Sequence, residues 1–258
     1  MNKTEISWTD LTWNPVAGCS KVSHGCQNCY AEYLTVHRFH RPFDVKLRPE
    51  RLKDVKNIPP GSKVFVNSMS DLFHEKVPLS YIRGVMEAIE SRPDVIFQVL
   101  TKRPERVEEY QNWVAKNFSD GHHYSIWFPQ NLWLGVSVEM KGFRDRISTL
   151  QYLKLNWQVI PGKIFVSFEP LLRDVTPVDL YGVDWIIIGG ESGPNHRPFN
   201  PDWARNLIKQ AKAQGVAVWM KQLGGFRPGN SMGELPEDLR IREFPETASP
   251  SNLTEAKQ

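Results

Sequence analysis

The chain has 258 residues, with 32 basic and 29 acidic side chains and a formal net charge of +3. Its hydrophobic fraction of 40% and charged fraction of 24% are those of a globular protein and exclude a disordered or collagen-like chain. No apolar stretch approaches the roughly 20 residues that span a bilayer. The N-terminus also lacks the apolar segment of a signal peptide. We therefore expect a cytoplasmic protein without membrane association.

Short runs of β-branched and aromatic residues alternate with longer polar stretches along the chain. The runs are expected to form strands buried on both faces, and they are Leu11–Pro15, Lys63–Asn67, Val95–Leu100, Leu132–Val136, Lys163–Ser167, Trp185–Gly189 and Ala217–Met220. The stretches between them that have helical apolar spacing are Leu79–Arg92, Pro104–Asn117, Gly142–Leu153 and Pro201–Gln214. Because strands that alternate with helices form parallel sheets, the pattern predicts an α/β fold.

Nearly every predicted strand ends in polar side chains. These are Ser68, Ser70, Asp71, Thr101, Lys102, Arg103, Ser137, Glu139, Ser167, Glu169, Glu191, Ser192, Lys221 and Gln222. The carboxyl ends of the strands line the pocket of a (β/α) barrel, so this pattern favours a full or partial TIM-like barrel over an open doubly wound sheet. We expect one such domain over residues 1–245 and a disordered tail over residues 246–258.

All three cysteines, Cys19, Cys26 and Cys29, lie within eleven residues of a loop at 18–31, between the first strand and the helix-compatible stretch Ala31–His40. An odd number of clustered thiols is a poor disulfide framework and indicates metal binding. A zinc ion with His24 as fourth ligand is one solution. A [4Fe–4S] cluster that leaves one iron open is the other. The predicted position at the pocket face favours the cluster, because a structural zinc site has no need to lie there.

At these residues the chain resembles the radical SAM superfamily, and more narrowly the phage gene-product-37/68 family of three-cysteine proteins. The resemblance covers residues 5 to 245. The blocks that carry it are Gly18-Cys19, Gly25-Cys26-Gln27-Asn28-Cys29-Tyr30-Ala31, Ser68-Met69-Ser70-Asp71-Leu72-Phe73, Leu100-Thr101-Lys102-Arg103-Pro104, Gly135-Val136-Ser137-Val138-Glu139, Ser167-Phe168-Glu169-Pro170-Leu171 and Gly189-Gly190-Glu191-Ser192-Gly193.

The resemblance implies that S-adenosylmethionine binds the open iron through its amino and carboxylate groups. Reduction would then release a 5′-deoxyadenosyl radical that abstracts hydrogen from a substrate. The sequence departs from the superfamily's commonest Cys-x3-Cys-x2-Cys pattern, because six residues separate Cys19 from Cys26. The aromatic residue, Tyr30, also follows the last cysteine instead of preceding it.

Candidate site residues follow from the strand ends and from the resemblance. The candidates for cofactor binding are Tyr30, Ser68, Ser70, Asp71, Lys102, Ser137, Glu139, Gly189, Gly190 and Glu191. Gly189-Gly190-Glu191 resembles the superfamily's methionine-binding triplet, although it ends the sixth strand instead of the second, and a tight turn is the alternative. Glu169 and Lys221 are the catalytic candidates. Alternatively, Glu139 and Glu169 form ion pairs with Lys102, Arg103 or Lys221.

Residues 38–63 carry eight basic and three acidic side chains, net +5, with Phe39 and Phe43 interleaved. Such a segment is typical of a nucleic-acid-facing surface and also of a solvated connection. The leading hypothesis is a radical SAM-type iron–sulfur enzyme that acts on nucleic acid or a nucleobase. The alternative is a zinc-stabilised nucleic-acid-binding protein without catalysis. No protein partner follows from the sequence.

Overall fold

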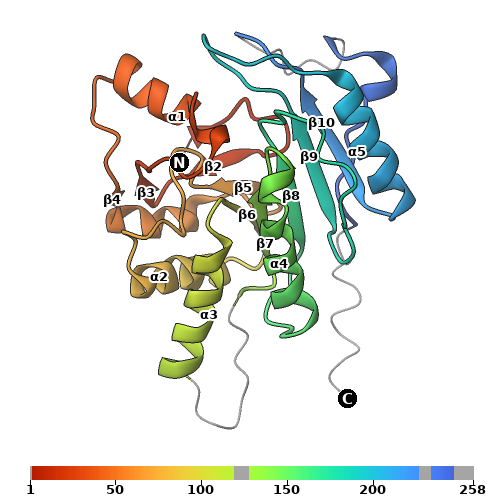
Figure 1. Ribbon diagram of the computed structural model, residues 1–258. Helices are drawn as coiled ribbons and strands as arrows, with labels where there is room; N and C mark the ends of the chain where they lie inside the picture. Colours follow the sequence, from red (N-terminus) through yellow and green to blue (C-terminus); the bar gives the residue numbers. More distant parts are fainter. Residues whose placement is uncertain (1, 119–127, 227–233, 247–258) are drawn as a thin grey trace.

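The computed structural model describes residues 2–118, 128–226 and 234–246. Its main sheet has eight strands in the order β1-β2-β5-β6-β7-β8-β9-β10. Every neighbouring pair from β2 to β10 is parallel, whereas β1 pairs antiparallel with β2. The seven parallel strands curl into a partial (β/α) barrel, with the helices α2 to α5 around their outside (Figure 1). The predicted fold class is confirmed in its partial form.

Each of the seven predicted strands is present, with ends that differ by no more than two residues. The strands of the main sheet are β1 (Asn2–Lys3), β2 (Leu11–Trp13), β5 (Lys63–Val66), β6 (Ile96–Thr101), β7 (Leu132–Ser137), β8 (Ile164–Phe168), β9 (Trp185–Gly189) and β10 (Ala217–Gln222). A second sheet pairs β3 (Val16–Ala17) with β4 (Lys46–Leu47). It fixes the start of the cysteine loop to the basic segment that follows the loop.

Four longer helices match the four predicted ones, and they are α2 (Leu79–Glu90), α3 (Pro104–Phe118), α4 (Asp145–Leu155) and α5 (Pro201–Ala213). The shorter helical segments are η1 (His24–Cys26), α1 (Tyr30–Tyr33), η2 (Leu34–Arg38), η3 (Pro49–Asn57), η4 (Lys141–Phe143) and η6 (Glu237–Leu239). None of the helices in the described residues has the length and apolar character needed to cross a lipid bilayer. The predicted tail, apart from Glu246, lies outside the described residues.

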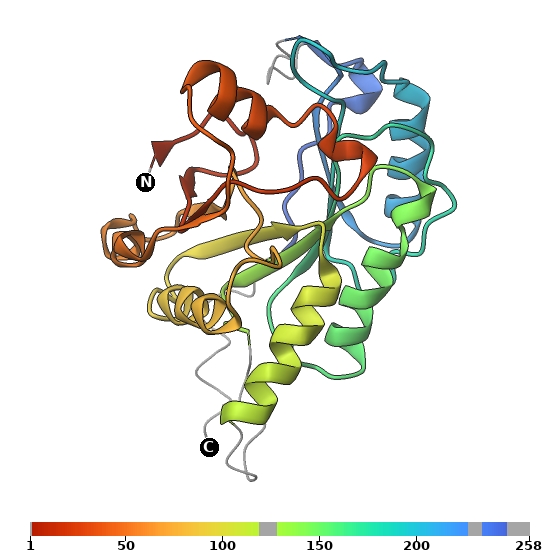
Figure 2. The ribbon, with the colours of Figure 1, turned by 60° about the vertical axis from the view of Figure 1, so that its left-hand side comes forward.

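Both faces of the sheet are buried, as predicted from strands in which apolar residues do not alternate with polar ones. Successive side chains on a strand point to opposite faces. The outward-facing side chains, such as Leu132 and Leu134 of β7, belong to the large core that includes the buried residues of α2 to α5. These helices lie against the outside of the sheet (Figure 2). The inward-facing side chains, together with Trp8 from the segment before β2, form a second, mainly aromatic cluster whose strand residues are Phe65, Trp133, Phe165, Trp185, Ile187 and Trp219. The barrel interior is therefore packed with rings instead of being hollow throughout.

The two edge strands of the sheet differ in how they are covered. At one edge, β10 is covered by the chain after η6: the Met220 amide donates to the Ile241 carbonyl, and the Glu243 amide donates to the Val218 carbonyl, both at 2.8 Å. At the other edge stands the two-residue strand β1. Between the edges, the Trp219 indole donates to the Ser7 hydroxyl at 3.2 Å. This bond links the segment before β2 to the last strand of the partial barrel.

Candidate functional site

A cavity of about 720 Å³ lies at the carboxyl ends of the strands. Trp8 and Phe65 of the aromatic cluster form part of its wall, as do Cys19, Cys26 and Cys29. The polar strand-end side chains that line it are Ser68, Ser70, Asp71, Thr101, Lys102, Arg103, Ser137, Ser167, Glu169, Glu191, Ser192, Lys221 and Gln222. The strand ends therefore share one cavity with the cysteine loop, as the barrel prediction requires.

The three thiols are free and half-buried. The loop that carries them starts at Gly18, whose φ of +76° and close approach to the Asp44 carbonyl leave no space for a side chain. Burial raises the pKa of the Cys19 thiol to about 11, and Asp71 adds to this effect while Arg103 opposes it. Burial also raises the pKa of Cys29. A bound metal would have to displace these protons.

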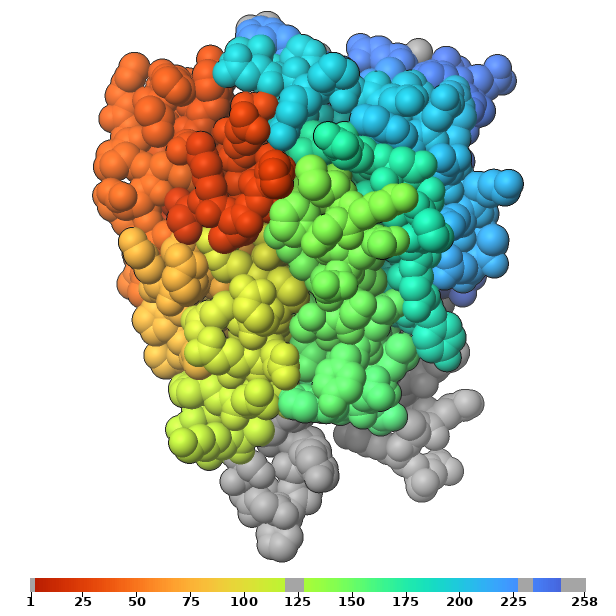
Figure 3. All heavy atoms as spheres, viewed as in Figure 1, coloured from red at the N-terminus to blue at the C-terminus, as the bar shows by residue number. Residues whose placement is uncertain are grey.

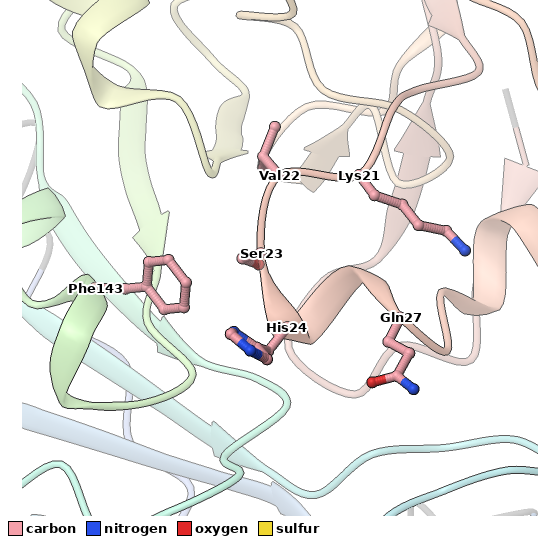
Figure 4. Close-up of a pocket in the computed structure, with 6 residues that line it drawn as sticks. All are labelled: Lys21, Val22, Ser23, His24, Gln27 and Phe143. Carbon is pink, nitrogen blue, oxygen red and sulfur yellow. The ribbon is translucent and has the colours of Figure 1, made fainter.

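Cys26 and His24, the candidate ligands of a zinc site, lie on different sides of the loop. In the described residues, no set of three His, Cys, Asp or Glu side chains, the three cysteines included, is arranged to hold a metal ion. His24 lines a separate hollow of about 480 Å³ on the other side, where its ring lies 6.3 Å from that of Phe143 (Figure 4). The thiols thus share a cavity from which the expected fourth zinc ligand is absent.

The cysteine loop is held by carboxylates and arginines from several strand ends, and Figure 3 shows the loop region packed against the chain that follows β7 and β9. Three side chains or pairs of side chains, here called clamps, make these contacts, and the first clamp is Arg103. Its Nη1 atom lies 3.0 Å from Asp71 and 3.6 Å from the Cys19 sulfur. Its Nη2 atom donates to the Ser20 carbonyl at 3.1 Å. Asp71 also accepts from the Thr101 hydroxyl at 2.8 Å, so its carboxylate is occupied within the protein.

The second clamp is Glu139, which is fully buried. It forms ion pairs with Lys102 at 3.0 Å and Arg146 at 3.1 Å, and it accepts from the Ser23 hydroxyl at 2.6 Å. Burial raises the pKa of Glu139, but Lys102, Ser23 and Arg146 outweigh it and hold that pKa below its ordinary value. Gly25 lies directly against this side chain, because a Cβ atom there would be 2.5 Å from the Glu139 Cγ.

The third clamp is the pair Glu191 and Arg197. Glu191 accepts from the Asn28 amide at 3.0 Å and from the Arg197 Nε at 2.9 Å. Arg197 in turn donates to the His24 carbonyl at 3.0 Å. Burial raises the pKa of Glu191, but hydrogen bonds from Arg197 and Asn28 outweigh it and hold the pKa below its usual value. Both ends of the Cys26–Cys29 turn are therefore anchored to the loop after β9.

The remaining cofactor candidates are also placed at or beside the cavity. Ser70 donates to the Val16 carbonyl at 2.7 Å, Ser68 donates to Asn14 at 3.3 Å, and the Tyr30 hydroxyl donates to the Ser68 carbonyl. Gly190 lines the cavity, whereas Glu139 and Gly189 lie behind it. Their role in cofactor binding stays a prediction.

Glu169 and Lys221 form an ion pair of 2.9 Å between the ends of β8 and β10. The Ser167 hydroxyl donates to Glu169 at 3.3 Å. Gly189 makes room for this carboxylate, because a Cβ atom there would lie 2.4 Å from the Glu169 Oε1. The ion-pair interpretation of Glu139 and Glu169 is thus the observed one, while a catalytic role for Glu169 and Lys221 stays a prediction.

Sequence reasoning did not find Arg146, Arg197 or Asn28 as parts of the site. Arg146 lies within helix α4 on the buried face that it shares with Leu150 and Leu153, where an apolar residue is the usual occupant. Arg197 lies in an irregular loop six residues after Glu191. Only the fold brings Arg197 to the cysteine loop and Arg146 to Glu139, so no local sequence pattern indicates these contacts.

Fold and site together define a partial (β/α) barrel with a three-cysteine loop at the carboxyl ends of its strands. The chain belongs to the family described as protein of unknown function DUF5131, whose model matches residues 3–249. No curated protein matches the chain.

Two solved structures of spore photoproduct lyase are similar to the chain. One is a cysteine-to-serine mutant, with a TM-score of 0.48 and 12% identity over 82% of this chain and 63% of that chain. The other is the lyase complexed with dinucleoside spore photoproduct, with a TM-score of 0.47 and 11% identity over the same shares. The chain therefore spans 63% of the length of these lyase chains.

Proposed function

We propose that this chain is a radical SAM-type iron–sulfur enzyme that acts on a nucleic acid or a nucleobase. Cys19, Cys26 and Cys29 would hold a [4Fe–4S] cluster, with one iron open to S-adenosylmethionine. When bound and reduced, these groups supply a 5′-deoxyadenosyl radical that abstracts hydrogen from the substrate.

The observation that carries the proposal is the common cavity of the three thiols. Three thiolates suit an iron–sulfur cluster with one open iron, and the adjoining space of about 720 Å³ falls within the range of small-molecule sites. The position of His24 in the opposite hollow favours this donor set over zinc. The three thiols and the volume of the cavity therefore support a cluster together with a nucleoside cofactor.

The chain's own residues would position and shield the reaction. Arg103, Glu139 and Glu191 hold the cysteine loop against three strand ends. Trp8 and Phe65 give the cavity an apolar wall that limits water. Glu169 and Lys221 offer a carboxylate and an ammonium group at the ends of β8 and β10, suited to ribose hydroxyls and to phosphate, respectively.

Anaerobic reconstitution with iron and sulfide tests the proposal. The expected result is about four irons per chain, together with 5′-deoxyadenosine released from S-adenosylmethionine under reductant. A colourless protein that retains one tightly bound zinc and releases no 5′-deoxyadenosine would contradict it and support the zinc-stabilised binding protein instead.

Two variants separate cluster from zinc in the same experiment. Cys26→Ala should lose the iron, whereas His24→Ala should retain about four irons, because His24 faces away from the cavity. If His24→Ala loses the metal as fully as Cys26→Ala does, His24 is a ligand and the proposed donor set is wrong.

A further inference from the structure

Four apolar side chains follow one another at three-residue spacing along α1 and η2 and face solvent. They are Tyr30 (43% exposed), Tyr33 (43%), Val36 (39%) and Phe39 (53%). Each three-residue step along a helix turns by about 60°, so these four, here called the aromatic stripe, wind around the exposed part of the segment. Figure 2 shows this helical segment standing out from the body of the molecule, beside the N-terminal strand. Exposed apolar side chains gathered on one short segment are typical of an interaction surface.

The aromatic stripe borders the cavity at both of its ends. Tyr30 and Phe39 line the cavity, together with Leu34 and Phe43. Tyr30 directly follows Cys29, which caps the N-terminus of α1. A ligand bound along the stripe would therefore reach the cavity that the three thiols line.

The surroundings of the stripe are cationic. Within the part of the chain that the structure describes, Arg38, Arg41 and Lys46 form no ion pair, and all three are exposed. Asp44 is the one acidic residue between positions 36 and 46. The His37 ring lies 4.9 Å from that of Tyr33 and extends the aromatic surface. Aromatic rings beside unpaired cations match the bases and phosphates of a nucleic acid, respectively.

We propose that the aromatic stripe, with Arg38, Arg41 and Lys46, binds single-stranded nucleic acid and presents an unpaired base to the cavity. Bases that are free of a duplex can stack on exposed rings, and the flanking cations then follow the phosphate backbone. A base in a duplex has both faces covered and its reactive atoms out of reach. The inference rests on the proposed function, since it names the substrate class of the same cavity.

Fluorescence anisotropy with a labelled 20-nucleotide single strand and with the matching duplex, on the reconstituted full chain, tests the inference. We expect tighter binding of the single strand than of the duplex and an affinity that falls as salt rises. Equal or tighter binding of the duplex, or no binding of the single strand at low salt, would overturn it.

Two kinds of variant divide the contribution of rings from that of charges. Phe39→Ala and Tyr33→Ala should each weaken single-strand binding by about fivefold or more, with an unchanged salt slope. Arg38→Gln and Arg41→Gln should each reduce the slope of log affinity against log salt by about 0.7. The matched controls are Tyr181→Ala, a 72% exposed aromatic residue elsewhere, and Lys209→Gln on α5. Stripe variants that bind as the controls do would remove the stripe from the interface.

The binding assay requires neither reductant nor S-adenosylmethionine, so its result is independent of the radical chemistry. A protein that releases 5′-deoxyadenosine but binds no single strand keeps the proposed function and loses this inference. A protein that binds single strands through the stripe but releases no 5′-deoxyadenosine keeps the interface and loses the proposed reaction.

Discussion

Glu139 joins the cysteine loop to the sheet through one fully buried carboxylate. Its negative charge pairs with the positive charges of Lys102 and Arg146, and it accepts a hydrogen bond from the Ser23 hydroxyl of the loop. Removing one partner of a buried ion pair leaves the other charge unpaired, and this costs far more than the loss of an exposed pair. The stability of this region therefore depends strongly on a residue that does not line the cavity.

We expect Glu139→Gln to lower the free energy of unfolding by about 3 kcal/mol and to reduce the iron retained after reconstitution. Urea denaturation at neutral pH measures the first effect, and iron analysis measures the second. The control is Glu50→Gln, whose side chain is 59% exposed and 4.0 Å from Arg48. If the variant and the control have the same free energy of unfolding, the ion pairs of Glu139 with Lys102 and Arg146 do not stabilise the fold.

Gly25→Ala tests the position of the loop without changing any charge. The added Cβ atom would lie 2.5 Å from the Glu139 Cγ, so the loop must move away from β7. We expect less iron per chain and a loss of stability of about 1–3 kcal/mol, as for overpacking elsewhere. Gly142→Ala is the matched control, because a Cβ atom there meets nothing within 4 Å. Full iron content in Gly25→Ala would mean that the loop tolerates the displacement.

At the scale of elements, the strands were predictable because burial on both faces leaves a strong signal in the sequence. Trp185–Gly189 was predicted with its observed bounds, since each of its residues is buried. The strands β1, β3 and β4 were not predicted, because two paired residues carry no periodicity. Their pairing depends on segments brought together by the rest of the fold.

The covering of β10 gives a prediction at this scale. Burial raises the pKa of Glu243, but Lys212 and the Val218 amide outweigh it and hold the pKa below its usual value. A carboxylate with a lowered pKa stabilises the folded state above its unfolded pKa and loses this contribution as pH falls through the folded pKa. The affected range therefore lies below the ordinary value of 4.5.

Glu243→Gln should consequently destabilise the protein at pH 7 and have a smaller effect at pH 3. Because the side chain is 42% exposed, we expect less than about 1 kcal/mol. Urea denaturation of both proteins at the two pH values measures the difference. An effect that is equal at both pH values would show that the charge of Glu243 makes no contribution.

For the whole molecule, the sequence indicated the barrel, the cysteine loop and the position of that loop at the carboxyl ends of the strands. Each of these follows from local patterns. The sequence did not indicate how the loop is held. Arg146 of α4 binds Glu139, which holds the loop, and Arg197 reaches the loop itself from the chain after β9; such contacts depend on the curvature of the completed sheet. The ion pair of Glu169 with Lys221 was one of two interpretations that the sequence left open.

Cluster binding should stabilise the whole fold, because it would bridge a loop that is anchored to three strand ends. A ligand at 100 times its dissociation constant adds about 2.7 kcal/mol, which corresponds to roughly 5–10 °C in Tm for a domain of this size. Anaerobic thermal melts before and after iron removal by a chelator measure the shift. Cys29→Ala should show no shift, and a similar shift in that variant would mean that the iron binds elsewhere.

The packed interior of the partial barrel has a consequence for the shape of the molecules that can reach the cavity. The cavity wall extends from Lys3 at one edge strand to Lys221 and Gln222 at the other. Because aromatic side chains fill the interior, a polymer can reach the cavity only across the carboxyl ends of the strands, and no end of the polymer has to pass through the barrel. If single strands are the substrate, a covalently circular strand should bind as well as a linear one, and a target base far from any terminus is as accessible as one at the end.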